Sequence, residues 1–380
     1  MDKRVYLLTI ITFIVGLVEL IIAGILPLIA TDLGVSLGEV GMLISLFSLS
    51  FAISGPVLLS LTAKIERKRL FLFVLFVFFL SNLMIVVMDG YVSLLVGRVL
   101  SAMCAALLIS LCLTIASQIS GEKYRARAIG IVLMGVSASL VFGIPFGLWL
   151  GNEFSWRAPF LFISILTLII MIVVYFALGP IEAKRGLPLK EQLKALKNKK
   201  IVLVQLTSIL FFAGHMSLYA YLTPFLSETM SITGNSLSLI YLIIGIVAVC
   251  GSFLGGQITD RLGAKRSIII VLSAFIVTII LIPYLQFSLA LFICALLLWN
   301  LLSWSLQPAI QSYLVSAAPE TSDIQQSLNN SGVHVGMAIG STVGGIIIDQ
   351  YHVEINPLIA GGFTCIALLI ILAAFKQKRK

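Results

Sequence analysis

The sequence predicts an all-α polytopic membrane protein with twelve transmembrane helices, arranged as two pseudo-symmetric six-helix bundles. First, 60% of the 380 residues are hydrophobic and 11% are charged, and the mean hydropathy is +1.12. This composition excludes a water-soluble fold, which needs far more polar surface. Second, apolar stretches of about 20 residues, long enough to cross the hydrocarbon as helices, follow one another along the chain. Third, much of the sequence pattern recurs 197 residues later.

The apolar stretches divide evenly between the two halves of the chain. Those in the first half cover residues 5–30, 38–62, 69–88, 92–118, 128–150 and 158–179. Those in the second half cover residues 201–226, 236–259, 266–286, 288–314, 328–348 and 356–375. We therefore expect an N-terminal bundle over 1–178, a cytoplasmic linker over 179–200 and a C-terminal bundle over 201–380.

The repeat extends to individual residues. Pro27 recurs as Pro224, and Lys68-Arg69 recurs as Lys265-Arg266. The glycines follow the same spacing, with Gly143 and Gly147 in the first half and Gly340 and Gly344 in the second. Parallel repeats of this kind are typical of secondary transporters, whose substrate site is expected between the halves near the middle of the membrane.

The net charge of +9 is explained by membrane topology and gives no reason to expect nucleic acid as a partner. Of the 25 Lys and Arg residues, 23 lie at the two ends of the chain or in alternate loops. Arg157 is the one basic residue of the intervening loops. The positive-inside rule therefore places both termini in the cytoplasm.

Nothing in the sequence indicates an enzyme. There is no phosphate-binding loop, and the five cysteines have no metal-ligand spacing. We expect no cofactor and no metal site, and a proton gradient in place of ATP as the energy source.

Two charged residues lie well inside predicted spans. Away from the span ends, Glu19 is the only carboxylate and Arg98 the only basic residue. A charge in the middle of the bilayer costs about 2.5–3.5 kcal/mol on insertion scales, so such residues are usually functional. Low dielectric favours the neutral acid and a nearby cation favours the carboxylate, so Glu19 is predicted to carry a proton and Arg98 to expel it. The alternatives are a carboxyl buried for packing and an arginine that reaches the outer interface.

The second half offers polar and aromatic side chains in place of charges. Phe211, His215 and Tyr219 share one helical face, which suits a flat ligand that forms hydrogen bonds. Two further polar faces are predicted to bind substrate; they contain Asn300, Trp304 and Gln307, and Asn330 and His334. The alternative for all of these residues is contact between helices.

Several motifs resemble those of the major facilitator superfamily along the whole chain. The segment Gly256-Gln257-Ile258-Thr259-Asp260-Arg261-Leu262-Gly263-Ala264-Lys265-Arg266 is similar to its loop signature. The resemblance implies a conformational latch formed by Gly256, Asp260, Arg261, Gly263, Lys265 and Arg266. The first-half copy departs from the signature, because Ala63 replaces the Asp and Glu66 replaces the Gly. Gly97-Arg98 resembles the proton-linked arginine motif, and Gly135, Gly143, Pro145 and Gly147 resemble the motif of exporters.

Within the superfamily, the chain resembles the twelve-span drug:proton antiporters, and most of all the bacterial purine base and nucleoside efflux pumps. The features that carry this resemblance are Leu17-Val18-Glu19-Leu20, Ala213-Gly214-His215, Tyr219-Ala220-Tyr221 and Leu302-Ser303-Trp304-Ser305-Leu306. The resemblance implies a monomer in the bacterial cell membrane that exports purine bases or nucleosides in exchange for protons. Multidrug efflux, with the drug resistance it confers, and sugar efflux are the alternatives.

Overall fold

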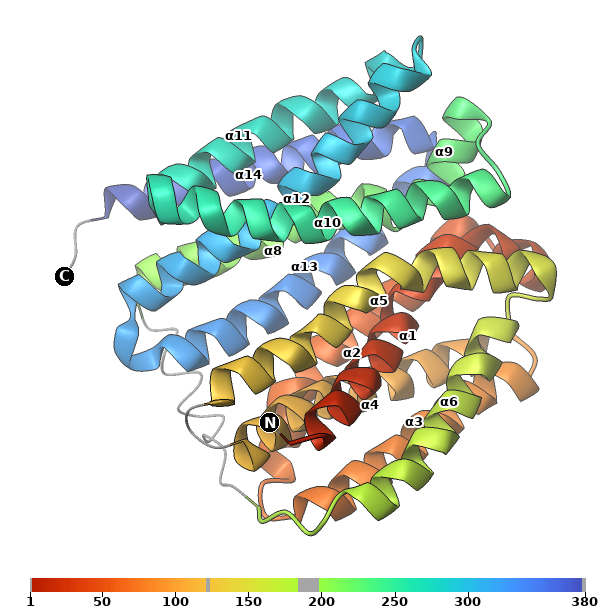
Figure 1. Cartoon of the computed structure of the whole chain (residues 1–380). Helices are drawn as coiled ribbons and strands as arrows, with labels where there is room; N and C mark the ends of the chain where they lie inside the picture. The colour runs from red at the N-terminus through yellow and green to blue at the C-terminus, as the bar shows by residue number, and fades with distance from the viewer. Residues whose placement is uncertain (1, 121–123, 184–197, 378–380) are drawn as a thin grey trace. The chain divides into compact units, whose positions relative to one another are not determined.

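The computed structural model describes residues 2–120, 124–183 and 198–377, and this part of the chain is helical throughout, without strands. Twelve of its helices are long and apolar enough to cross a membrane, which confirms the predicted number of spans. The first six are α1 (Arg4–Leu33), α2 (Leu37–Leu61), α3 (Arg67–Val87), α4 (Tyr91–Ile119), α5 (Arg125–Glu153) and α6 (Ala158–Ala177) (Figure 1). The others are α8 (Lys199–Tyr219), α10 (Asn235–Leu262), α11 (Ala264–Leu281), α12 (Leu289–Ala317), α13 (Ser322–Gln350) and α14 (Asn356–Lys376), with a short α9 (Leu222–Met230) after α8.

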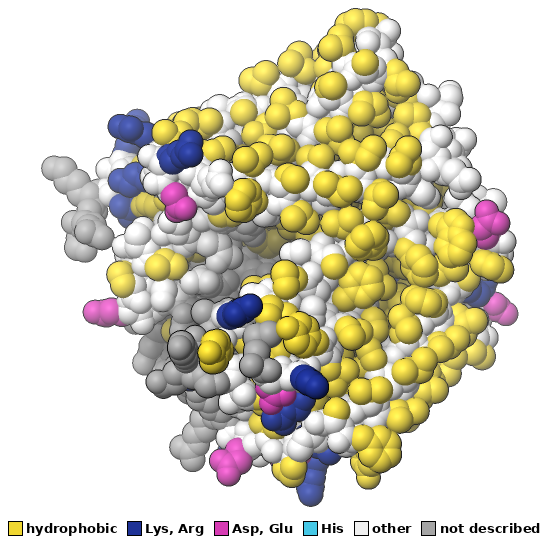
Figure 2. All heavy atoms as spheres, in the orientation of Figure 1, with side chains coloured by type: hydrophobic (Ala, Val, Ile, Leu, Met, Phe, Trp, Pro, Cys, Tyr) yellow, Lys and Arg dark blue, Asp and Glu magenta, His cyan; other side chains and the backbone are white. Residues whose placement is uncertain are grey.

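The chain forms two compact units. The first comprises Met1–Gly34 and Ser50–Pro188, and the second comprises Val35–Leu49 and Leu189–Lys380. The start of α2 therefore packs with the second unit. Most of the expected linker, residues 184–197, lies outside the described residues. Figure 2 shows hydrophobic side chains spread widely over the face of the molecule in view, as expected for a surface that contacts lipid.

Glycine allows the closest helix packing in each unit. In the first unit α1 packs along α5, where a Cβ on Gly135 would clash with the carbonyl oxygen of Thr9. In the second unit α8 packs along α13 in the same way, and a Cβ on Gly340 would clash with the carbonyl oxygen of Ala213. Lipid provides no hydrophobic force between helices, so this close van der Waals packing is a principal source of stability.

The repeated proline has different consequences in the two units. Helix α1 continues through Pro27, whereas the stretch predicted as one helix over 201–226 is divided between α8 and α9. Pro224 lies in the first turn of α9, where its missing N–H is tolerated. Tyr221, in the break, is buried and donates a hydrogen bond to the carbonyl oxygen of Ser341 (2.7 Å). Its counterpart in the first half is Gly24, which has no side chain to make such a contact.

The first turn of α2 is bonded to the last turn of α13. Ser36 and Glu39 form a reciprocal cap, because each side chain accepts the backbone N–H of the other residue (3.1 and 2.8 Å). The carboxylate of Asp349 then accepts the Ser36 hydroxyl (2.7 Å) and the Gly38 N–H (3.0 Å). The negative charge of Asp349 is unfavourable at the C-terminal end of α13, where the helix dipole is also negative. It is favourable at the N-terminal end of α2, where the dipole is positive, so the contact stabilises the start of α2 and offsets the cost at the end of α13.

Replacement of Asp349 by alanine removes both hydrogen bonds from the start of α2. The expected loss is about 1 kcal/mol, the usual cost of deleting a helix cap. It would be measured as a lower midpoint of thermal unfolding of the purified protein in detergent. Gln350→Ala, at the exposed neighbouring position, is the control. Equal midpoints for the two variants would show that the Asp349 contact contributes nothing.

Candidate functional site

The structure brings Glu19 and Arg98 together inside the first unit. Arg98 is fully buried on α4, and its Nη1 donates a hydrogen bond to the carbonyl oxygen of Val18 (2.6 Å), the residue before Glu19 on α1. Glu19 is half-buried and interacts electrostatically with Arg98. A carboxyl group and a permanent cation thus lie side by side within two membrane spans.

The packing of α3 against α4 holds Arg98 in the interior. A Cβ on Gly97 would clash with Ile85, so the two helices approach closely beside the arginine. One turn further along α4, the Ser101 hydroxyl lies 2.8 Å from the Ser81 hydroxyl on α3. This face of α4 is therefore enclosed by protein, and Arg98 projects from it toward α1.

The predicted aromatic face of the second unit is a buried cluster. The ring of His215 stacks on Tyr219 (5.0 Å between centroids) and lies 5.1 Å from the ring of Trp299 on α12. The Ser303 hydroxyl lies 2.9 Å from His215 Nδ1, so α12 holds the imidazole in a fixed orientation. Phe211 extends the cluster toward Phe275 on α11 (4.8 Å).

Trp299 was not predicted to belong to this site. It is fully buried and lies one helical turn before Ser303, a spacing that could have identified it once Ser303 was known to face His215. Trp304, which was predicted, is only half-buried. The indole of Trp299 is therefore the tryptophan ring that stacks near His215.

Three polar atoms on α12 are buried and have no hydrogen-bond partner among the described residues. They are Trp299 Nε1, Asn300 Oδ1 and Gln307 Oε1. Asn300 uses its amide nitrogen to donate to the carbonyl oxygen of Ile244 on α10 (2.8 Å). A buried polar group without a hydrogen bond is energetically costly. The three atoms, one donor and two acceptors, are therefore candidates for hydrogen bonds with a ligand.

The two residues of α13 that were predicted to bind substrate differ in their exposure. His334 is buried, whereas Asn330 is exposed. The adjacent Asn329, which was not predicted, is buried and donates to Gln205 Oε1 (2.9 Å) and Ser208 Oγ (2.8 Å) on α8. Asn329 thus joins α13 to α8.

The residues of the predicted latch surround the turn between α10 and α11. Gly263 has a φ of 79°, which favours glycine, and its N–H caps α10. Asp260, Arg261, Lys265 and Arg266 are exposed, and no hydrogen bond or ion pair joins Asp260 to another described residue. The close approach to α12 is made by Gly255, since a Cβ on Gly256 would meet open space.

The exporter motif lies on α5. Gly135 and Gly147 both contact α1 closely, and a Cβ on Gly147 would clash with Ile21. Gly143 is less constrained, because a Cβ there would lie 3.5 Å from Leu17. Pro145 lies inside the helix without ending it. The motif therefore shapes the contact between α5 and the helix that carries Glu19.

In the first-half copy of the loop signature, Glu66 caps α3. Its carboxylate accepts the backbone N–H groups of Lys68 (2.9 Å), Arg69 (2.8 Å) and Ile181 (2.8 Å). Burial pushes the pKa of Glu66 upward, but the three N–H donors outweigh it and hold the pKa below its usual value. The acid that replaces glycine thus fastens the segment after α6 to the start of α3.

Glu66→Ala should lower the stability of the protein by about 1 kcal/mol at neutral pH, since it removes a helix cap. A lowered pKa contributes stability that is fully present above the ordinary pKa of glutamate, about 4.3. The contribution is lost as the pH falls through the lowered value. Thermal unfolding in detergent should therefore separate the wild type from the variant at pH 7, and much less at pH 3. A pH-independent difference would contradict this account.

Twelve helices long and apolar enough to cross a membrane, and an internal repeat of 197 residues, are typical of a multi-pass membrane transporter. The sequence profile of the Major Facilitator Superfamily matches residues 8–324, and the chain belongs to this superfamily. It is therefore a transporter and not an enzyme.

Relatives over almost the full length agree with this assignment. The chain is 34% identical to the uncharacterized MFS-type transporter YbcL of Bacillus subtilis, covering 99% of this chain and 97% of the relative. It is 26% identical to a probable sugar efflux transporter of Helicobacter pylori, covering 96% and 93%. Among solved structures, a bacterial homolog of the human lysosomal transporter Spinster, in an inward-facing and occupied conformation, is similar in fold. Its TM-score is 0.79 at 17% identity, over 99% of this chain and 97% of that one.

Proposed function

We propose that this protein exports a small organic solute, a purine base or nucleoside, in exchange for protons by alternating access. The observation that carries the proposal is the burial of Arg98 beside Glu19 within membrane spans. Charges in such a place are costly, and they are retained where they act on an ion or a substrate.

Arg98 and the hydrocarbon surroundings act on Glu19 in opposite directions. A guanidinium stays charged in proteins, so its proximity favours the ionised carboxylate and release of the proton. When the two groups separate, the low dielectric favours the neutral acid and binding of a proton. A conformational change that alters the distance between α1 and α4 would therefore couple proton movement to transport.

The second unit supplies the chemistry that suits a purine. The rings of His215, Tyr219 and Trp299 offer flat apolar surface, and Trp299 Nε1 and Asn300 Oδ1 offer a donor and an acceptor. Purine bases combine a flat ring system with hydrogen-bonding edges.

Sugar export is the second candidate. Relatives covering most of this chain are named as probable sugar efflux transporters. Amide groups such as those of Asn300 and Gln307 also suit sugar hydroxyls, which both donate and accept hydrogen bonds.

Glu19→Gln should abolish export driven by a pH gradient, because the amide cannot carry a proton. Labelled substrate and a pH-sensitive dye would be followed together in inverted membrane vesicles with an imposed gradient. Glu153→Gln, at the exposed end of α5, is the matched control and should keep both fluxes. Thermal unfolding would establish that both variants are folded. Unchanged coupled transport in Glu19→Gln would refute the proton-carrier role.

Cells that contain the protein should accumulate less labelled adenine and hypoxanthine than cells without it. A labelled hexose and a cationic dye, tested in parallel, report the two competing functions. Trp299→Leu should raise the KM for the purine by about three- to tenfold, as expected for a lost hydrogen bond and stacking surface. Trp149→Leu, exposed on α5, should leave the KM unchanged. Equal purine accumulation in both kinds of cell would exclude the first choice of substrate.

A further inference from the structure

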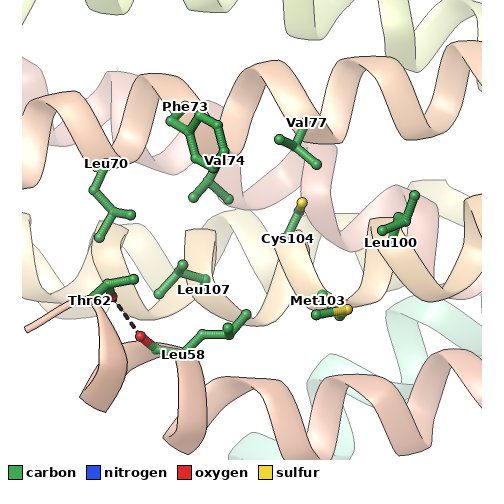
Figure 3. A pocket seen from close by; sticks show the side chains of 10 residues that line it. All are labelled: Leu58, Thr62, Leu70, Phe73, Val74, Val77, Leu100, Met103, Cys104 and Leu107. Carbon is green, nitrogen blue, oxygen red and sulfur yellow. Dashed lines mark hydrogen bonds between the residues drawn. The ribbon is translucent and has the colours of Figure 1, made fainter.

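The first unit contains an apolar cavity of about 210 Å³ between α2, α3 and α4 (Figure 3). Neither Glu19 nor Arg98 is among the residues that line it. Its walls are formed by Leu58, Thr62, Leu70, Phe73, Val74, Val77, Leu100, Met103, Cys104 and Leu107.

The internal repeat shows why the cavity exists in this unit. In the second unit α10 packs closely on α12, where a Cβ on Gly255 would clash with the backbone of Ser305. The residue 197 positions before Gly255 is Leu58, which lines the cavity. The first unit thus has a leucine side chain where the second has only hydrogen, and a Cβ on Gly55 would lie 3.9 Å from Ala106 on α4.

The cavity offers a ligand no hydrogen bond. Nine of its ten residues are apolar, and the remaining hydroxyl, of Thr62, donates to the carbonyl oxygen of Leu58 (2.6 Å) (Figure 3). An apolar cavity of about 150 Å³ engineered in another protein stays free of water and binds benzene. The cavity is therefore suited to hydrocarbon, and the exposed side chain of Phe73 places its outer wall at the lipid-facing surface.

The surface at the Thr62–Leu70 end of the cavity is basic. Lys64 and Arg69 are exposed there, and Leu70, directly after Arg69, lines the cavity. The one acid of this loop, Glu66, accepts three backbone N–H groups and also interacts electrostatically with Arg69. Lys64 and Arg69 lie just beyond the apolar part of the span, where the phosphate of a membrane lipid is expected.

We propose that this cavity binds one acyl chain of an anionic glycerophospholipid, whose phosphate is held by Lys64 and Arg69. The hydrocarbon walls select the chain, and the two basic residues select the headgroup. A transported solute would need contacts with Glu19 or Arg98 under the proposed function, and neither residue lines this cavity. The bound lipid fills the space that Gly255 closes in the other unit and supports α2 against α4.

The test compares lipids retained by the full-length protein in native mass spectrometry, with phosphatidylglycerol and phosphatidylcholine of identical chains supplied in equal amounts. We expect wild type to retain one phosphatidylglycerol in preference. The double variant Lys64→Gln/Arg69→Gln should lose this preference, by about fivefold for each charge removed. Lys265→Gln/Arg266→Gln is the matched control, because it removes two basic residues beside the closely packed α10 and α12.

A second pair of variants fills the cavity. Val77→Phe and Leu100→Phe should each abolish retention of the lipid. Added phosphatidylglycerol should raise the unfolding temperature of the wild type but not that of either variant. Retention by a folded, filled variant would overturn the proposal, as would equal retention of the two lipids by the wild type. An equally large loss of the phosphatidylglycerol preference in Lys265→Gln/Arg266→Gln would show that any basic surface attracts the lipid. That result would also overturn the proposal. Should neither filled variant fold, the headgroup preference and its loss in Lys64→Gln/Arg69→Gln decide the question.

Discussion

Hydrocarbon cannot form hydrogen bonds, and this constraint governs most of what the structure contains. Polar side chains within a span are therefore stabilised by partners in the protein. The hydroxyl of Thr12 donates to the carbonyl oxygen of Val132, Arg98 donates to that of Val18, and Asn300 donates to that of Ile244. Each of these bonds joins two helices, and glycine brings neighbouring backbones close where such bonds form. Close helix packing and hydrogen bonds between helices therefore occur together.

The two halves share an architecture and have diverged in chemistry. The first unit holds the two charged residues that lie away from the span ends, Glu19 and Arg98. The second holds neutral groups that stack and form hydrogen bonds, centred on His215 and Trp299. Two structural differences coincide with differences between residues at repeat positions. Tyr221 in place of Gly24 accompanies a broken helix, and Leu58 in place of Gly255 accompanies a cavity.

The sequence predicted most of the spans to within a few residues, because the length and composition that lipid demands are directly visible in it. The exceptions are the span over 201–226, which is broken after Tyr219, and the start of α13, which begins at Ser322. The charged pair was also predictable, since a charge is conspicuous against an apolar background. Trp299 and Asn329 were missed for a related reason. A tryptophan or an amide in a span can face lipid, a neighbouring helix or a ligand, and its neighbours in sequence do not distinguish these environments.

By itself, the sequence determined the membrane class, the twelve helices, the twofold repeat and the presence of an acid and a cation well inside the spans. These follow from local composition and from spacing along one chain. Only the tertiary structure decided that Arg98 meets the backbone beside Glu19, that Trp299 joins His215, and that α2 stands away from α4. Such outcomes depend on which face of a helix meets which neighbour, and on side-chain volumes at contacts between residues far apart in the sequence.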